Sequence, residues 1–366
     1  MSSQGATLTY LSDITLPMSG DIPQFGLSVA ISGNEALVAA PKQSDKASGF
    51  ATAYFKDASG TWQMSVGTTL SYAHSAIDAS SYLPCNGVAI DGDAAVLGVP
   101  EAAGGHGIVE VFQLDSSGWG QTDVLSAQMP SAFETFGCAT AISGDTMVVS
   151  APGHAGVGAA YVFVRQAAGW ELQSQLTATS AAANDAVGLS ASIDGDVVVL
   201  GAPHSNANKG AAYVFRRSGT TWSEVKKLIA AGGSADDQFG ATVAVSNGTI
   251  VVGAPDFNAG QGAVYIYSGT AFTPQSSPLT ETAQRFGSAV AVSGNRVIVG
   301  AIGSNAAYAY TREGTEWFRR QTFGDLSTSR FGGAVGISGS DAIIGAMGVD
   351  HAYIVHDDQI FANGYQ

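Results

Sequence analysis

The sequence predicts an all-β fold, a β-propeller of seven four-stranded antiparallel blades. A phrase that reads FGATVAVSNGTIVVGAP at residues 239–255 occurs seven times in related form. Its copies are separated by 45 to 59 residues, a period that suits a four-stranded blade. The 47 glycines and the charged fraction of only 12% also favour short strands joined by tight turns. The units start near Phe25, Pro84, Phe136, Val187, Phe239, Phe286 and Phe331.

Each unit contains four strand signals, which we name A to D from the centre of the ring outward. In the fourth unit they cover residues 189–194, 197–203, 210–217 and 222–230. Strand A, which reads LSASID, has the small alternating residues that a crowded inner ring requires. Turn pairs such as Gly-Asp and Asn-Gly separate the strands and suit hairpins that need positive φ angles.

The N-terminus is expected to close the ring. The seventh unit stops after strand C, while residues 6–17 contain Tyr10 and Leu16 with the same six-residue separation as Trp222 and Leu228 in a D strand. As the outer strand of blade 7, this segment leaves no open sheet edge. The repeated Trp residues are expected to be packing anchors. We therefore expect one domain over residues 1–366, with a C-terminal tail at 357–366.

The FG…GAP phrase, the G-x-x-Y-V-F strand and the Trp that follows it resemble FG-GAP repeats. Such repeats form the blades of the integrin α-subunit head and of many bacterial and fungal secreted proteins. Integrin-like blades often carry a calcium loop, D-x-D-x-D-G-x-x-D, between strands A and B. Here that connection is a tight turn such as Asp194-Gly195-Asp196, which cannot supply six to eight oxygen ligands. The chain is therefore similar to a short-turn, calcium-free bacterial type. We expect no metal and no cofactor, and we expect the turn carboxylates to accept hydrogen bonds from their own backbone.

The charge and the chain ends restrict the partners and the location. A net charge of −15 argues against a nucleic-acid partner. The sequence contains no run of 18 or more apolar residues, so we expect no insertion into a membrane. The N-terminal MSSQGATLTY has no signal-peptide features, which fits either a cytosolic protein or a chain from which a leader has been removed, and we favour the second interpretation. The ending IFANGYQ resembles that of some secreted bacterial proteins. We expect a monomer that is secreted or held at the cell surface.

The connections from B to C and from D to A share one face of a propeller, which we call the loop face. Loops on a rigid scaffold often carry function, so the candidate ligand-binding residues are taken from this face. Three histidines in successive blades suggest metal binding or acid–base chemistry, but their unequal offsets from the loop proline favour ordinary exposed side chains. Two arginines before FG are suited to a carboxylate ligand, with a solvated side chain as the alternative. The candidates are Glu101, His106, His154, His204, Asn206, Asp256, Arg285 and Arg330.

The second unit is the most irregular. Its FG is replaced by Pro84-Cys85, and Glu110 stands where other C strands have Tyr. Its long preceding loop marks either a functional segment or simple drift. Cys85 and Cys138 lie near the start of strand A in neighbouring blades, within reach of a disulfide, but the one-residue difference in their offsets leaves free thiols as the alternative.

Three functions fit these observations. The first is a binding or adhesion module that recognises a glycan or a protein through the loop face. The second is a polysaccharide lyase or hydrolase whose site, on the same face, uses Glu101 and the loop histidines. The third is a structural domain of a larger surface assembly. The sequence contains no G-x-S-x-G, H-E-x-x-H, C-x-x-C or Walker motif, so an enzyme is the weaker prediction.

Overall fold

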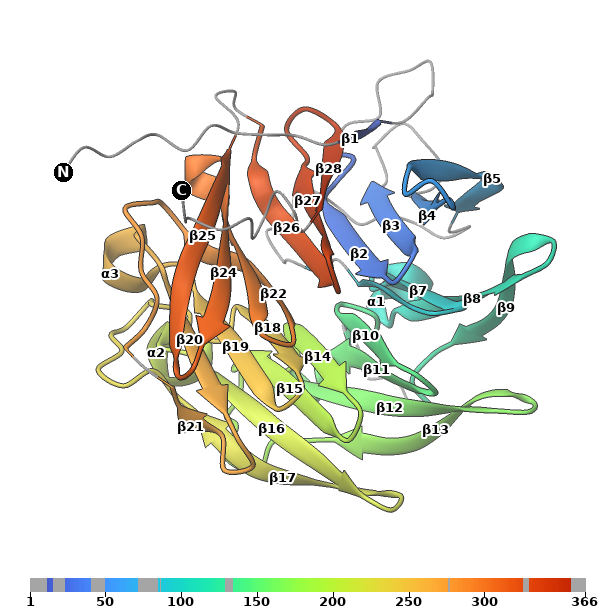
Figure 1. The fold of residues 1–366 in the computed structure, drawn as a ribbon. Coiled ribbons are helices and arrows are strands. Elements are labelled where there is room, and N and C mark those ends of the chain that lie inside the picture. The colour runs from blue at the N-terminus through green and yellow to red at the C-terminus, as the bar shows by residue number, and fades with distance from the viewer. Residues whose placement is uncertain are drawn as a thin grey trace.

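The computed structural model describes residues 12–15, 24–40, 50–71, 85, 87–128, 134–275, 277–324 and 329–356. These residues form seven four-stranded antiparallel sheets arranged as the blades of a ring (Figure 1). In six sheets the strands follow one another in chain order, from A near the centre to D at the rim. The predicted fold class and the count of seven blades are therefore confirmed.

The strand bounds lie within about two residues of those predicted for the fourth unit. The A strands are β2 (Ser28–Ser32), β6 (Val88–Asp91), β10 (Thr140–Ser143), β14 (Ser190–Asp194), β18 (Thr242–Ser246), β22 (Phe286–Ser293) and β26 (Phe331–Ser338). The B strands are β3 (Glu35–Ala40), β7 (Ala94–Val99), β11 (Thr146–Ala151), β15 (Val197–Ala202), β19 (Thr249–Ala254), β23 (Arg296–Ala301) and β27 (Asp341–Ala346). The C strands are β4 (Phe50–Lys56), β8 (Ile108–Asp115), β12 (Ala159–Gln166), β16 (Ala211–Ser218), β20 (Ala263–Ser268), β24 (Ala306–Glu313) and β28 (His351–His356). The D strands are β5 (Trp62–Ser71), β9 (Gly118–Leu125), β13 (Gly169–Leu176), β17 (Thr221–Leu228), β21 (Thr273–Pro274), β25 (Glu316–Gly324) and β1 (Ser12–Thr15).

Short helical turns occupy five of the B-to-C loops. They are α1 (Ala102–Gly105), η1 (His154–Gly156), α2 (Ser205–Asn208), α3 (Phe257–Gly260) and η2 (Ile302–Ser304). In the described part of the chain, no helix combines the length and hydropathy that crossing a membrane would need.

The N-terminal strand closes the ring, as predicted. Strand β1 pairs with β28 in antiparallel register and completes blade 7, while Tyr10 and Leu16 lie outside the described residues. A buried ion pair strengthens the same closure. The Asp341 carboxylate of blade 7 accepts a hydrogen bond from Lys56 Nζ of blade 1 at 2.8 Å and lies 2.5 Å from His356 Nδ1. Asp341 is thus shared between the first and last blades.

The hydrophobic core lies between the blades. The largest cluster joins Val199 and Val214 of blade 4 to Val252 and Tyr265 of blade 5, around Phe239. Six of the seven seams have the corresponding Phe or Val at their centre, with no exposed surface; these residues are Phe25, Phe136, Val187, Phe239, Phe286 and Phe331. Four of the five predicted Trp anchors are buried as well, namely Trp119, Trp170, Trp222 and Trp317, while Trp62 is half-buried. Each blade therefore depends on its neighbours for its core.

Glycines let the backbones of adjacent blades meet. Gly240, the glycine of FG in blade 5, has φ +90° and faces Gly201, the glycine of GAP in blade 4. A Cβ on Gly201 would lie 2.0 Å from Gly240 O, and one on Gly240 would lie 2.2 Å from Ala211 O. Real Cβ atoms do not approach backbone so closely, so both positions require glycine. The repeated phrase therefore holds the two sides of one contact between neighbouring units.

The A-to-B turns form a second ring of contacts on the opposite face, which we call the turn face. The Asp91 carboxylate accepts a hydrogen bond from Gly144 N–H at 2.7 Å, and Asp194 accepts one from Asn247 N–H at 2.7 Å. In each case the donor belongs to the next blade, so the expectation that these carboxylates bond their own backbone was wrong. Serines at the same position accept similar bonds in the pairs Gly33–Ser338, Gly92–Ser32, Gly195–Ser143 and Gly294–Ser246.

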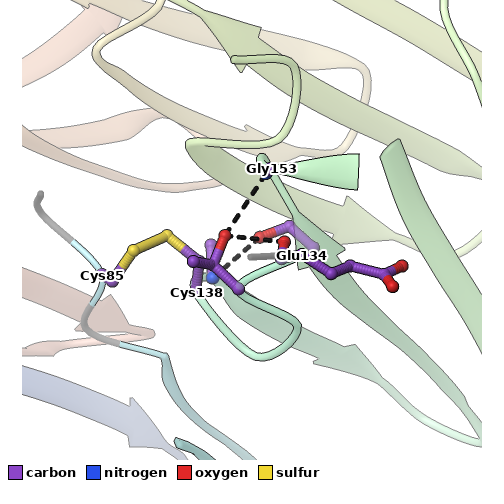
Figure 2. The surroundings of a disulfide bond; sticks show 7 residues. Cys85, Glu134, Cys138 and Gly153 are labelled. Atoms are coloured by element: carbon purple, nitrogen blue, oxygen red, sulfur yellow. Dashed lines mark hydrogen bonds between the residues drawn. A yellow bond between two sulfur atoms is a disulfide. The ribbon is translucent and has the colours of Figure 1, made fainter. Parts of the chain in front are cut away.

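A disulfide joins Cys85 to Cys138 and so links the start of blade 2 to strand A of blade 3 (Figure 2). Both residues are buried, and they pack with Leu189 of blade 4. The cross-link spans 53 residues along the chain. It therefore constrains the second blade, whose FG glycine position is occupied by Cys85.

The close contact between blades predicts a large cost for adding a single methyl group at Gly240. Gly240→Ala should lower the free energy of unfolding in urea by at least about 3 kcal/mol, because positive φ and overpacking both oppose the new Cβ. Gly232→Ala is the matched control, since Gly232 has φ +75° but no atom within 4 Å of the added Cβ. This control should lose only about 1 kcal/mol. Equal losses would show that the approach of the backbones is not the limiting constraint.

The disulfide predicts a second stability change. Replacing both cysteines by serine should lower the free energy of unfolding by about 2–4 kcal/mol, because a loop of this length is no longer restricted in the unfolded chain. Wild-type protein in dithiothreitol should show a comparable loss in the same urea titration. Unchanged midpoints for both the variant and the reduced protein would contradict a stabilising cross-link.

Candidate functional site

The loop face is assembled at the seams between blades. The B-to-C loop of one blade contacts the residue before FG in the next blade: Gln238 N–H donates to Asn208 O at 2.8 Å, and Arg285 N–H donates to Gly260 O at 2.8 Å. That residue before FG has a left-handed backbone in six blades. The six are Gln24 (φ 72°), Thr135 (54°), Ala186 (56°), Gln238 (57°), Arg285 (57°) and Arg330 (52°). Non-glycine residues rarely adopt this conformation, so the neighbouring blade must hold it in place.

The eight candidate residues are spread over six blades of this face. In blade 2, Glu101 precedes α1 and His106 follows it, and both are half-buried. In blade 3, the half-buried His154 begins η1. In blade 4, His204 precedes α2, which contains Asn206, and both are exposed.

The remaining three candidates belong to blades 5 to 7. Asp256 precedes α3, while Arg285 and Arg330 come directly before the Phe of blades 6 and 7. The structure brings Asp256 and Arg285 together across a seam, with Oδ1 and Nη1 3.1 Å apart. Arg330 is held through its backbone, since its N–H donates to Asn305 Oδ1 of blade 6 at 2.8 Å. Its side chain is exposed.

The three loop histidines remain in separate blades. His106, His154 and His204 belong to blades 2, 3 and 4, at different positions in their loops. Over the described ranges, no group of three or more His, Cys, Asp and Glu side chains is arranged to hold a metal ion.

His154 instead belongs to a cluster that the sequence did not predict. Its Nδ1 lies 2.9 Å from Oε1 of Glu134, whose side chain is fully buried, and the Tyr161 hydroxyl donates to the same oxygen. On the other side of the imidazole, Gln175 Nε2 lies 2.8 Å from His154 Nε2. A carboxylate can only accept, so Nδ1 carries the proton and Nε2 accepts from the Gln175 amide. The imidazole is thus oriented on both sides.

The same contacts affect Tyr161. Burial raises the pKa of its hydroxyl, and the hydrogen bond to the Glu134 carboxylate raises this pKa further. Tyr161 therefore stays protonated and acts as a donor. Glu134 also lies in the segment anchored by the disulfide, because Cys138 N–H donates to Thr135 O at 3.1 Å (Figure 2).

The repeat explains how Glu134 reached this place. It stands two residues before Phe136, and Asp185 and Asp237 occupy the same position in the next two units. All three are buried. The shorter carboxylates turn back on their own loops, where Asp185 accepts from Ala182 N–H at 3.0 Å and Asp237 accepts from Ser234 N–H at 2.6 Å. The longer Glu134 side chain reaches Tyr161 and His154 instead. A Glu where the next two units have Asp is thus the signal that could have indicated the cluster.

Comparison with known proteins agrees with this geometry. Residues 119–163, 170–215 and 222–267 match the sequence profile described as FG-GAP repeat, and no curated protein matches the chain. Among solved structures, the chain is similar to one described as "Crystal Structure of Mitotic Checkpoint Complex", with 11% identity and a TM-score of 0.60 over 97% of this chain and 96% of the other. At that identity the likeness concerns the fold alone. Each matched segment runs from the D strand of one blade through strand C of the next, so the chain contains three consecutive FG-GAP repeats within a seven-bladed β-propeller.

Proposed function

We propose that this chain is a secreted or cell-surface binding module that recognises a glycan or protein ligand through the loop face. An FG-GAP propeller is consistent with a binding or a structural module. The choice between them rests on how the two faces of the ring differ.

The seams on the loop face carry this proposal. They fix the backbone before FG in the same left-handed conformation, while the side chain at that position changes from Ala186 to Thr135 to Arg285. A rigid backbone with varied, partly exposed side chains is suited to recognition, because the backbone loses little conformational entropy when a ligand binds. On the turn face, by contrast, the first residues of the turns are engaged with the next blade.

The disulfide supports the proposed location. Disulfides persist in oxidising compartments and are uncommon in the cytosol. The Cys85–Cys138 bond joins two blades and belongs to the core of the ring, which favours a role in an extracellular or cell-surface protein.

The loop face predicts which surface substitutions will reduce ligand binding. On a glycan array, the double variant His204→Ala, Lys209→Ala should lose at least about fivefold of the wild-type signal, since both residues are exposed in the blade 4 loop. The matched control is Asn34→Ala, Asn295→Ala, which changes two exposed residues of the turn face. The control should bind like the wild type.

The same array separates the competing functions. A signal that survives EDTA would agree with a calcium-free module, whereas loss with EDTA would contradict it. Loss of binding in the turn-face control alone would contradict recognition by the loop face. An array without any signal would contradict a glycan ligand and would favour a protein partner.

The Glu134 cluster predicts a structural role for His154. His154→Ala should lower the free energy of unfolding by about 1–3 kcal/mol, because the buried Glu134 carboxylate loses a hydrogen-bond donor. The glycans that His154→Ala binds on the array, and their signal strengths, should match those of the wild type. His204→Ala serves as the control and should alter stability by no more than about 0.5 kcal/mol, as expected for an exposed side chain. If His154→Ala instead removed a polysaccharide-cleaving activity, the enzyme hypothesis would replace the binding one.

A further inference from the structure

Blades 6 and 7 differ from their neighbours on the loop face. Their B-to-C loops contain only residues 302–305 and 347–350, whereas the loop of blade 5 spans 255–262. Short loops cover less of the seams beside them. Arg285 and Arg330, which stand at the two seams that border blade 6, are both exposed.

Three acids that the structure describes in this region are already engaged. Asp256 pairs with Arg285 at 3.1 Å, and Asp350 Oδ1 accepts from the Gln24 backbone N–H. Glu281 accepts from the Tyr310 hydroxyl at 2.6 Å and pairs with Arg319 Nη1 at 2.7 Å. The arginines offset the negative charges of Asp256 and Glu281, whereas Asp350 keeps its charge and is held by a backbone N–H.

Arg330 is left with its charge available. Its guanidinium makes no ion pair with a described residue, although its backbone is fixed by the 2.8 Å bond to Asn305. Arg285 is oriented by Asp256 and still has 47% of its side chain exposed. Two exposed arginines at the seams on either side of blade 6 offer several N–H donors, and guanidinium groups suit planar carboxylates.

The surroundings favour a saccharide over a protein. The loop of blade 6 offers Ser304 and Asn305, and Gln284 beside it is exposed. The large apolar side chains exposed in the described chain lie elsewhere, on or next to the D strands; they are Met64, Val124, Val225, Ile229 and Phe318. Protein interfaces usually rely on aromatic or aliphatic anchors, and the described residues at this end of blade 6 include no exposed large apolar side chain.

We propose that the loop end of blade 6, between Arg285 and Arg330, binds a carboxylate of an acidic polysaccharide. This inference rests on the proposed function and names the ligand class of the same face. Successive uronate units along one polymer would rebind the same subsite and raise the apparent affinity.

Calorimetry with a matched pair of sugars tests the inference. De-esterified oligogalacturonate should bind at least about tenfold more tightly than its fully methyl-esterified form, and oligoalginate should also bind. Arg330→Gln and Arg285→Gln should each weaken binding of the acidic sugar by about tenfold. Lys226→Gln removes the same charge from an exposed position of strand β17 and should leave the affinity for the acidic sugar unchanged.

Each alternative outcome is informative. Equal binding of the ester, or unchanged affinity of Arg330→Gln, would overturn the carboxylate subsite; the loop-face function would still stand if the His204, Lys209 variant loses array binding. Failure of both acidic sugars to bind would overturn the assignment. If polyglutamate bound instead of the acidic sugars, and its binding depended on the arginines, the site would be assigned to an acidic protein and the polysaccharide assignment would also be overturned.

Discussion

The close approach of backbones at the seams is the constraint on which the rest of this structure depends. The glycine of GAP in one blade and the glycine of FG in the next leave no room for a Cβ. A Cβ added to Gly98 would lie 1.9 Å from Gly137 O, and one added to Gly300 would lie 2.0 Å from Gly332 O. Because the backbones touch there, the Phe of FG can be buried beside them with no exposed surface. A single blade has neither contact, so stability belongs to the closed ring and not to its units.

The exceptions to the glycine rule are consistent with this view. Where blade 2 has Cys85 in place of the FG glycine, the facing position of blade 1 is Ala39 and not glycine. Blade 3 has Ser150 at the GAP position, and there a Cβ on Gly188 would lie 2.9 Å from Ala159 O, compared with 2.2 Å from Ala211 O for a Cβ on Gly240. Other residues thus take the place of glycine at these two seams. The disulfide itself joins blade 2 to blade 3, beside the close contact of Gly98 with Gly137.

The close backbone contacts at the seams also explain which features the sequence predicts and which it does not. Backbone contacts that only glycine permits recur in most units, so the blades, their strands and the closing role of the N-terminal segment could be predicted from the period. Contacts between individual side chains that occur in one unit or at one seam leave no period. The pair of Lys56 with Asp341 spans 285 residues, and the cluster around Glu134 depends on one extra methylene relative to Asp185. The pairing of Arg285 with Asp256 was hidden for the same reason, although both residues were candidates for the loop face.

An overall charge of −15 does not oppose an acidic ligand at blade 6. Interactions between exposed charges are largely screened beyond about 8–10 Å at physiological ionic strength, so a ligand responds to the groups beside it. Beside the blade 6 loop, the carboxylates of Asp256 and Glu281 are paired with arginines, while Arg330 remains exposed. The distant acids act mainly by repelling ligands that miss this place. The net charge thus affects solubility and the rate at which ligands encounter the protein, whereas the local charge decides which chemical group can be bound.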